Sequence, residues 1–297
     1  MAKFYGYAID PTCRDKNGGT QVILHHGHAL KHLGHEWGGL LDLNSPIPPD
    51  GDFIIFQSEW YRAINRHLEL TKAKSICWLG TFLSNLIYDM PQISEMAERC
   101  DYFMTQWQGK AFAYGREMLV RYKKDIYYLP HGWCEDCDTE GVIIPAPKTL
   151  FIGHHYPERG EDWLDMAGVE KIEVPMEDCK NYYKSAIVCP NLSGDFQKDR
   201  RTDFFEVEGR MLNDRVFKII MAGGFCVQDD TEILREFYDE DEVPMAHSAE
   251  EYKKLIDYYV ANPDERLPFM KKAVERTKRE HSYTTRWKKY IDEVLHI

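Results

Sequence analysis

The 297-residue sequence has no long apolar stretch. A membrane-spanning helix needs about 18 or more consecutive apolar residues, and no stretch of this sequence is that long. We therefore expect no membrane span. Residues 1–10 are too polar at their end for a signal peptide and are expected to form a strand. Glycine (20) and proline (14) are ordinary in number and no repeat is visible, which excludes collagen-like, low-complexity and solenoid classes.

An excess of basic residues is also missing. The sequence has 37 Lys and Arg against 49 Asp and Glu, a net charge of −12. This argues against a general polyanion binder, because affinity for phosphate backbones comes mainly from Lys and Arg. Residues 135–297 carry the whole excess (23 basic, 35 acidic), whereas residues 1–134 hold 14 of each. The neutral first half leaves local nucleic-acid binding open.

Cofactor and metal patterns are absent or incomplete. No G-x-G-x-x-G run exists, which excludes the usual nicotinamide-dinucleotide fingerprint. The one C-x-x-C pair, Cys134 and Cys137, has no second pair at zinc spacing, so the eight cysteines favour free thiols in a reducing, cytoplasmic compartment. The Asp-x-Asp sequence at Asp239–Asp241 lies in an acidic loop, so we do not interpret it as a metal-binding motif. We therefore expect no metal and no cofactor.

Strand and helix patterns alternate along the chain. Strands are expected at 4–9, 37–43, 53–56, 75–79, 102–104, 126–129, 149–152, 172–174, 186–189 and 225–227. Helices are expected at 22–33, 60–70, 83–100, 110–122, 163–167, 178–184, 214–222, 248–261, 263–280 and 283–295. This alternation predicts an α/β fold with parallel sheets.

A change of composition at 135–148, with acidic residues and then Pro145 and Pro147, indicates a domain boundary. We predict two Rossmann-like domains facing each other across a cleft, at 1–140 and 149–280. The last helix, within 281–297, is expected to cross back to the first domain.

One set of motifs in the second half occurs in a characteristic order. It comprises the run Asp214–Phe225, Leu234 with Phe237, Glu250–Tyr252, Asn262–Arg266 and His281–Trp287. Over about residues 149–295 this set resembles the C-terminal half of two-domain (GT-B) glycosyltransferases, specifically the spore-maturation-like CgeB type. The resemblance implies transfer of a sugar from a nucleotide-diphosphate sugar, for which we expect a UDP-sugar. The donor would lie in the second domain and the acceptor in the first.

The sequence departs from that family at two positions. Many retaining members use a Glu-x7-Glu pair to hold the donor sugar and ribose hydroxyls, whereas Arg210 and Lys218 stand here. Cations cannot accept a hydroxyl proton, but they can bind a diphosphate or a sugar carboxylate. A non-catalytic binding module is therefore an alternative, and retention or inversion of configuration is open.

Seven residues are candidates for holding the donor. Arg215 lies in the first turn of a helix, where the dipole disfavours a cation unless an anion is bound beside it. Lys218 is one turn further on the same face. Gly18 and Gly19 permit close approach to a phosphate, or form a plain turn. His131, Arg210 and Gly223 complete the set from their places in the resemblance.

Three residues are candidates for the catalytic base. Asp10 follows the first strand, although an Asp before Pro11 also suits a turn. His26 is one of three histidines early in the next helix, where exposed histidines are the commoner case. Asp89 follows the fourth strand.

The acceptor is open. A glycan, a surface polymer, a protein or a small molecule all fit. A narrower hypothesis is phage-type glycosylation of hydroxymethylated DNA bases, since residues 60–124 hold 10 basic against 6 acidic residues, with Trp78 and Trp107. An epimerase on the same fold is a further alternative, and the oligomeric state is not indicated.

Overall fold

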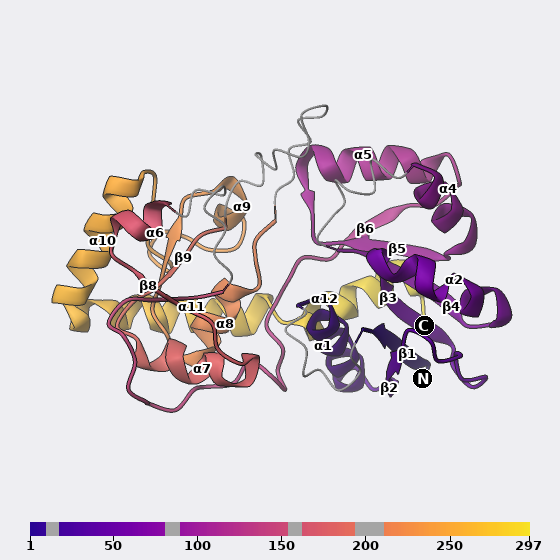
Figure 1. The fold of residues 1–297 in the computed structure, drawn as a ribbon, viewed down its shortest axis with the longest axis horizontal. Coiled ribbons are helices and arrows are strands. Elements are labelled where there is room, and N and C mark those ends of the chain that lie inside the picture. The colour runs from indigo at the N-terminus through magenta and orange to yellow at the C-terminus, as the bar shows by residue number, and fades with distance from the viewer. Residues whose placement is uncertain (10–17, 81–89, 154–161, 194–210) are drawn as a thin grey trace. The chain divides into compact units, whose positions relative to one another are not determined.

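A computed structural model describes residues 1–9, 18–80, 90–153, 162–193 and 211–297. The chain divides into two compact units. The first contains Met1–Pro130 and Tyr283–Ile297, and the second contains the described residues between them. Each unit is built on parallel strands (Figure 1). Within these described ranges no helix is long and apolar enough to cross a membrane.

The first unit has a six-stranded parallel sheet. Its strands are β1 (Lys3–Ala8), β2 (Glu36–Asp42), β3 (Phe53–Gln57), β4 (Lys74–Leu79), β5 (Tyr102–Thr105) and β6 (Ile126–Tyr128), in the order β2-β1-β3-β4-β5-β6. All five residues of β3 are buried, as expected for a central strand covered on both faces. Its helical segments are α1 (Gly18–His32), η1 (Ser58–Trp60), α2 (Tyr61–Leu70), α4 (Met90–Arg99) and α5 (Gly109–Val120).

The strand order of the first sheet reverses at β1. Gly6 of β1 pairs in register with Leu40 of β2 and with Ile55 of β3. Ligands of open α/β sheets bind beyond the carboxyl ends of the strands at such a reversal. The chain that follows β1, residues 10–17, lies outside the described residues.

Helix α1 packs closely on the edge of this sheet. A Cβ atom on Gly27 would lie 2.2 Å from Cε2 of Trp37, and one on Gly6 would lie 2.7 Å from Cη2 of the same indole. The two glycines thus make room for Trp37 between helix and sheet.

The C-terminal segment belongs to the first unit. It forms α12 (Tyr283–Tyr290) and a π-helical turn, η6 (Ile291–Leu295). Trp287 is fully buried, and its Nε1 donates a hydrogen bond to Nδ1 of His26 on α1 at 2.9 Å. This bond ties the end of the chain to its first helix.

The described strand pairs of the second unit are parallel as well. Its strands are β7 (Leu150–Ile152), β8 (Glu170–Ile172), β9 (Cys189–Asn191), β11 (Cys226–Asp229) and β12 (Met245–Ala246). β7 pairs with β8, and β11 lies between β9 and β12. A parallel bridge between Thr149 and Val188 joins the two sets.

Alternating side chains give the second unit two cores. Leu150 and Ile152 pack on one face with helices α7 (Met176–Ser185), α8 (Arg215–Ala222) and α11 (Leu267–Glu280). Phe151 packs on the other face with α6 (Asp162–Met166) and α10 (Ala249–Ala261). This period of two places helices on both faces of the sheet. The remaining segments are α9 (Glu232–Arg235) and η5 (Pro263–Arg266).

Several elements differ from the sequence expectation. A strand was expected at 186–189, but β9 begins at Cys189 and ends at Asn191. Of the residues before it, Val188 forms an isolated bridge with Thr149. The expected helix at 263–280 divides into η5 and α11. α9 and β12 were not expected, because elements of four and two residues are too short to show a periodic pattern.

Candidate functional site

Polar residues gather where three strands of the second unit end. β7, β9 and β11 run parallel, so their carboxyl ends lie at one edge of the sheet. Gly153 follows β7, Asn191 ends β9, and Asp229 ends β11. Arg215, the first residue of α8, reaches this edge through its bond to Asn191. The carboxyl edge is where open α/β sheets bind ligands.

Two uncharged side chains, those of Asn191 and Phe151, contact Arg215 there. Its Nη1 donates to Oδ1 of Asn191 at 2.8 Å, and its Cζ lies 4.3 Å from the ring centroid of Phe151, a cation–π contact. Within the described residues no Asp or Glu forms an ion pair with it. The side chain is half-buried, so a cation is kept at the amino-terminal end of a helix, where the dipole itself favours an anion.

A buried set of carboxamides stands behind Arg215. Asn191 and Gln228 are fully buried, and Nδ2 of Asn191 donates to Oε1 of Gln228 at 2.6 Å and to Oδ1 of Asn213 at 3.1 Å. Nε2 of Gln228 donates to Oγ of Ser193 at 2.8 Å and also to Asp229. Each buried amide group therefore has a partner, which fixes the direction in which it points.

Gly153 approaches Arg215 closely. It has φ +149°, a backbone conformation that favours glycine, and a Cβ atom built on it would lie 2.5 Å from Nη2 of Arg215. A side chain at this position would displace the guanidinium. The glycine therefore permits this backbone conformation at the end of β7 and leaves room for the guanidinium of Arg215.

Lys218 lies one turn along α8 and is paired. Its Nζ lies 2.6 Å from Oδ2 of Asp214, and the side chains are 14% and 29% exposed. Burial lowers the pKa of Lys218, but the carboxylates of Asp214 and Asp138 outweigh it and hold that pKa above its ordinary value. Lys218 is thus a charged residue whose charge Asp214 balances. Asp214 precedes the helix without capping it through its side chain.

This arrangement suits a phosphate-bearing ligand. The first turn of α8 presents N–H groups that have no partner inside the helix, and Arg215 adds a guanidinium beside them. A guanidinium binds phosphate oxygens through two parallel N–H donors. The edge therefore has the two features that diphosphate sites use: a helix amino terminus and an oriented arginine.

The comparison with protein families bears directly on this region. A family model described as glycosyl transferase-like matches residues 143–292, which are 150 of the 297 residues. The chain belongs to this family. The match spans β7 to α12 and so includes Gly153, Asn191 and Arg215. No curated protein matches the chain.

Solved structures of glycosyltransferases share the fold of this glycosyl transferase-like chain. A sucrose-phosphate synthase from Thermosynechococcus elongatus matches with a TM-score of 0.68 and 11% identity, over 100% of each chain. T4 phage BGT in complex with UDP-glucose matches at 0.65 and 10%, over 99% of this chain and 100% of that one. An alpha-glucosyltransferase in complex with UDP and a 13-mer DNA containing an HMU base matches at 0.69 and 9%, over 98% of each. These likenesses show the α/β GT-B fold predicted from the sequence.

Two further predicted donor residues, Gly223 and His131, are described in the second unit. Gly223 ends α8 in a left-handed conformation (φ +82°), eight residues after Arg215. At 1.5 Å per residue this is roughly 12 Å along the helix. It lies beside Lys184, where it stops the helix before β11. His131 is buried and directly follows Pro130, where the N-terminal segment of the first unit ends. Arg210 lies outside the described residues.

The candidates of the first unit are only partly described. Gly18 and Gly19 form the first turn of α1 rather than a loop before it. His26, a candidate base, is 1% exposed and packs against Trp78, Tyr283 and Trp287, so the alternative of an exposed helix histidine is wrong for it. Asp10 and Asp89 lie outside the described residues.

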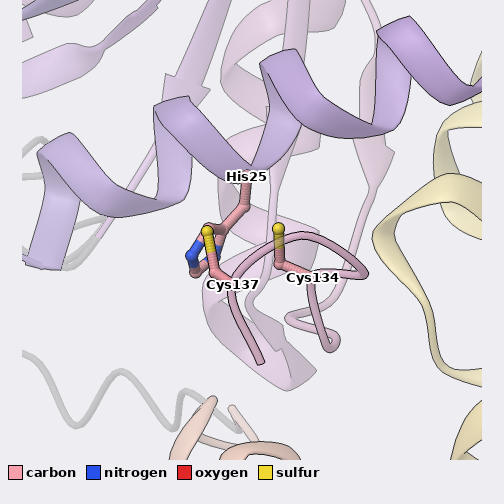
Figure 2. Close-up of side chains that lie close together, drawn as sticks. All are labelled: His25, Cys134 and Cys137. Carbon is pink, nitrogen blue, oxygen red and sulfur yellow. The ribbon is translucent and has the colours of Figure 1, made fainter. Parts of the chain in front are cut away.

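Cys134 and Cys137 project from one loop of the second unit (Figure 2, where His25 of α1 in the first unit is also drawn). Their Sγ atoms lie within 4.8 Å of each other. The hydrogen bond with Cys137, together with burial, raises the pKa of the Cys134 thiol well above its usual range. The backbone N–H of Cys134 donates to Oδ2 of Asp138 at 2.8 Å, which fixes the turn.

Sequence reasoning missed Asn191, Gln228 and Gly153. Each lies at the carboxyl end of a parallel strand, and this position was the available signal. Asn191 was hidden because we expected the strand to end two residues earlier, which left this asparagine in a polar loop.

Proposed function

We propose that this chain transfers a sugar from a nucleoside-diphosphate donor, a UDP-sugar, to an acceptor hydroxyl, as a member of the CgeB type. The observation that carries the proposal is Arg215, a half-buried guanidinium oriented by Asn191 and paired with no described carboxylate. The glycosyl transferase-like family match and the neighbours named with UDP or UDP-glucose support it.

The chemistry explains why such a cation matters. When the bond between the sugar and the diphosphate breaks, negative charge grows on the leaving diphosphate. Donors that are already oriented stabilise that charge without reorganising at the moment of reaction. In this proposal Arg215 and the first turn of α8 supply them, and Lys218 contributes to the donor side while paired with Asp214.

The donor would thus be bound by residues 149–280 and the acceptor by residues 1–140. A base is needed if configuration inverts. Asp10 and Asp89 stay our candidates for it. His26 is a weaker candidate, since its Nδ1 already accepts the bond from Trp287.

Calorimetry with a panel of nucleotide sugars tests the proposal, followed by mass analysis of acceptor mixtures incubated with the donor that binds. We expect one UDP-sugar to bind and one acceptor to gain the mass of one sugar residue, with release of UDP. If none of the nucleotide sugars in the panel binds, the proposal is contradicted. Binding without hydrolysis or transfer supports the alternative of a non-catalytic module, and a changed sugar with no UDP release supports an epimerase.

A DNA acceptor is the second candidate. The observation in its favour is the solved neighbour in complex with UDP and DNA. In this chain, however, Arg116 pairs at 3.0 Å with Asp125, which lies just outside residues 60–124, so part of the basic excess of that stretch is balanced. Binding of hydroxymethylated DNA that weakens steeply as salt rises would support this acceptor. Absent or salt-insensitive binding would exclude it.

A further inference from the structure

The guanidinium of Arg215 is oriented by a neutral group. Buried arginines are ordinarily paired with carboxylates, which orient the guanidinium and cancel its charge together. Here Oδ1 of Asn191 accepts the bond from Nη1 at 2.8 Å, so the orientation is kept while the positive charge is retained.

The direction of the Asn191 carboxamide is fixed from behind. Its Nδ2 donates to Oε1 of Gln228 and to Oδ1 of Asn213, two oxygens that only accept, so its own oxygen must face Arg215. Gln228 is oriented in turn because its Nε2 donates to Oγ of Ser193 and to Asp229. Arg215 therefore donates to Asn191 at the end of β9, Asn191 donates to Gln228 in β11, and Gln228 donates to Ser193 and Asp229. Each group in this series fixes the direction of the one before it.

We propose that Asn191 is a positioning residue that makes the Arg215 site selective for anionic ligands. It orients the guanidinium toward the diphosphate and, being neutral, leaves the charge of Arg215 for the ligand. This inference rests on the proposed function, since it names what prepares Arg215 for a donor diphosphate. Asn191 itself acts through Arg215 and is not a catalytic residue.

The Asn191→Asp variant separates charge from shape, because Asp has nearly the same size and still offers an oxygen to Arg215. The new carboxylate would form an ion pair with the guanidinium and compete with the ligand's phosphates. It would also face the oxygens of Gln228 and Asn213, so folding is checked by thermal unfolding. Asn191→Ala is the second variant: it removes the orienting oxygen without adding charge.

The experiment is calorimetry of UDP and uridine with the full chain and each variant. We expect the affinity for UDP to fall about 10- to 100-fold in Asn191→Asp and by a smaller factor in Asn191→Ala, with uridine affinity unchanged. Asn181→Asp is the matched control. It adds the same charge on α7 and keeps the oxygen that accepts from the N–H of Val142, so we expect wild-type affinity.

Two results would overturn the inference: equal loss of UDP and uridine affinity, which indicates a merely structural role, or UDP binding by Asn191→Asp as tight as by Asn191→Ala. If Asn191→Asp does not fold, unchanged UDP affinity in Asn191→Ala overturns it. Failure of the proposed function is a separate outcome, since it appears as absence of UDP binding by the wild-type chain.

Discussion

Arg215 shares its surroundings with a glycine that no other residue replaces easily. Gly153→Ala would place a methyl group 2.5 Å from Nη2 of Arg215, and its φ of +149° strains a side-chain-bearing residue by about 1–3 kcal/mol. Because the end of the Arg215 side chain must move aside, we expect Gly153→Ala to lower UDP affinity about tenfold, measured by calorimetry.

Gly168 provides the control for this prediction. It also has a positive φ, +65°, but a Cβ atom there would meet nothing within 4 Å. Gly168→Ala should therefore lower the unfolding midpoint and leave UDP affinity unchanged. Equal UDP affinity in the two variants would show that Gly153 is needed only for its backbone conformation.

The cysteines differ in their expected reactivity. Of the seven in the described ranges, Cys137 is partly exposed and the other six are buried. Burial raises the pKa of Cys179 to about 11 and that of Cys189 to about 12, so both stay thiols at neutral pH. Since the thiolate is the nucleophile, iodoacetamide at pH 8 should label Cys137 first among these seven, as read by peptide mass analysis. Faster labelling of Cys189 would contradict the described packing.

The sequence identified Arg215 as a candidate by one physical argument: the helix dipole disfavours a cation in the first turn of a helix unless an anion is bound beside it. It could not show that Lys218, on the same face, is already paired. The i,i+4 spacing of Asp214 and Lys218 was a usable signal for that pair. The orienting role of Asn191 and Gln228 was out of reach, because it depends on contacts between strands that lie 37 residues apart.

A buried hydrogen bond joins helix α12 to α1. Trp287→Phe removes the Nε1 donor and leaves Nδ1 of buried His26 without it. We expect the free energy of unfolding to fall by about 1 kcal/mol, the usual net contribution of one buried hydrogen bond, measured by denaturant titration.

A double-mutant cycle with His26→Phe isolates this bond from the packing of the indole ring. The expected result is that Trp287→Phe costs clearly less when His26 is already replaced. Strictly additive losses would mean that the hydrogen bond between α1 and α12 contributes nothing to stability.

Elements with strong patterns were predictable, and short ones were not. The run Phe53–Phe56 indicated a strand, and β3 forms there with all five of its residues buried. β12 has only two residues and exists because it pairs with β11, a contact that local sequence does not encode. β9 lies later than expected because pairing with β11 sets its register, Cys189 with Cys226, against the local apolar pattern.

For the molecule as a whole, the alternation of strand and helix patterns was enough to predict parallel α/β sheets, because parallel strands require crossover connections. The net charge of −12 was less informative about what the protein binds. Our proposal rests on one oriented guanidinium, that of Arg215, within an acidic half of the chain, and a net charge does not report such a group.

The most direct test of the account is calorimetry of UDP binding to the wild-type chain and to Arg215→Ala. Arg279→Ala is the matched control, since Arg279 is 60% exposed near the end of α11 and pairs with Glu280. We predict that Arg215→Ala loses about 1–3 kcal/mol of binding free energy, as for a lost hydrogen bond to a charged group, while Arg279→Ala binds as the wild type does. Equal UDP affinity in all three proteins would remove Arg215 from the donor site and contradict the account.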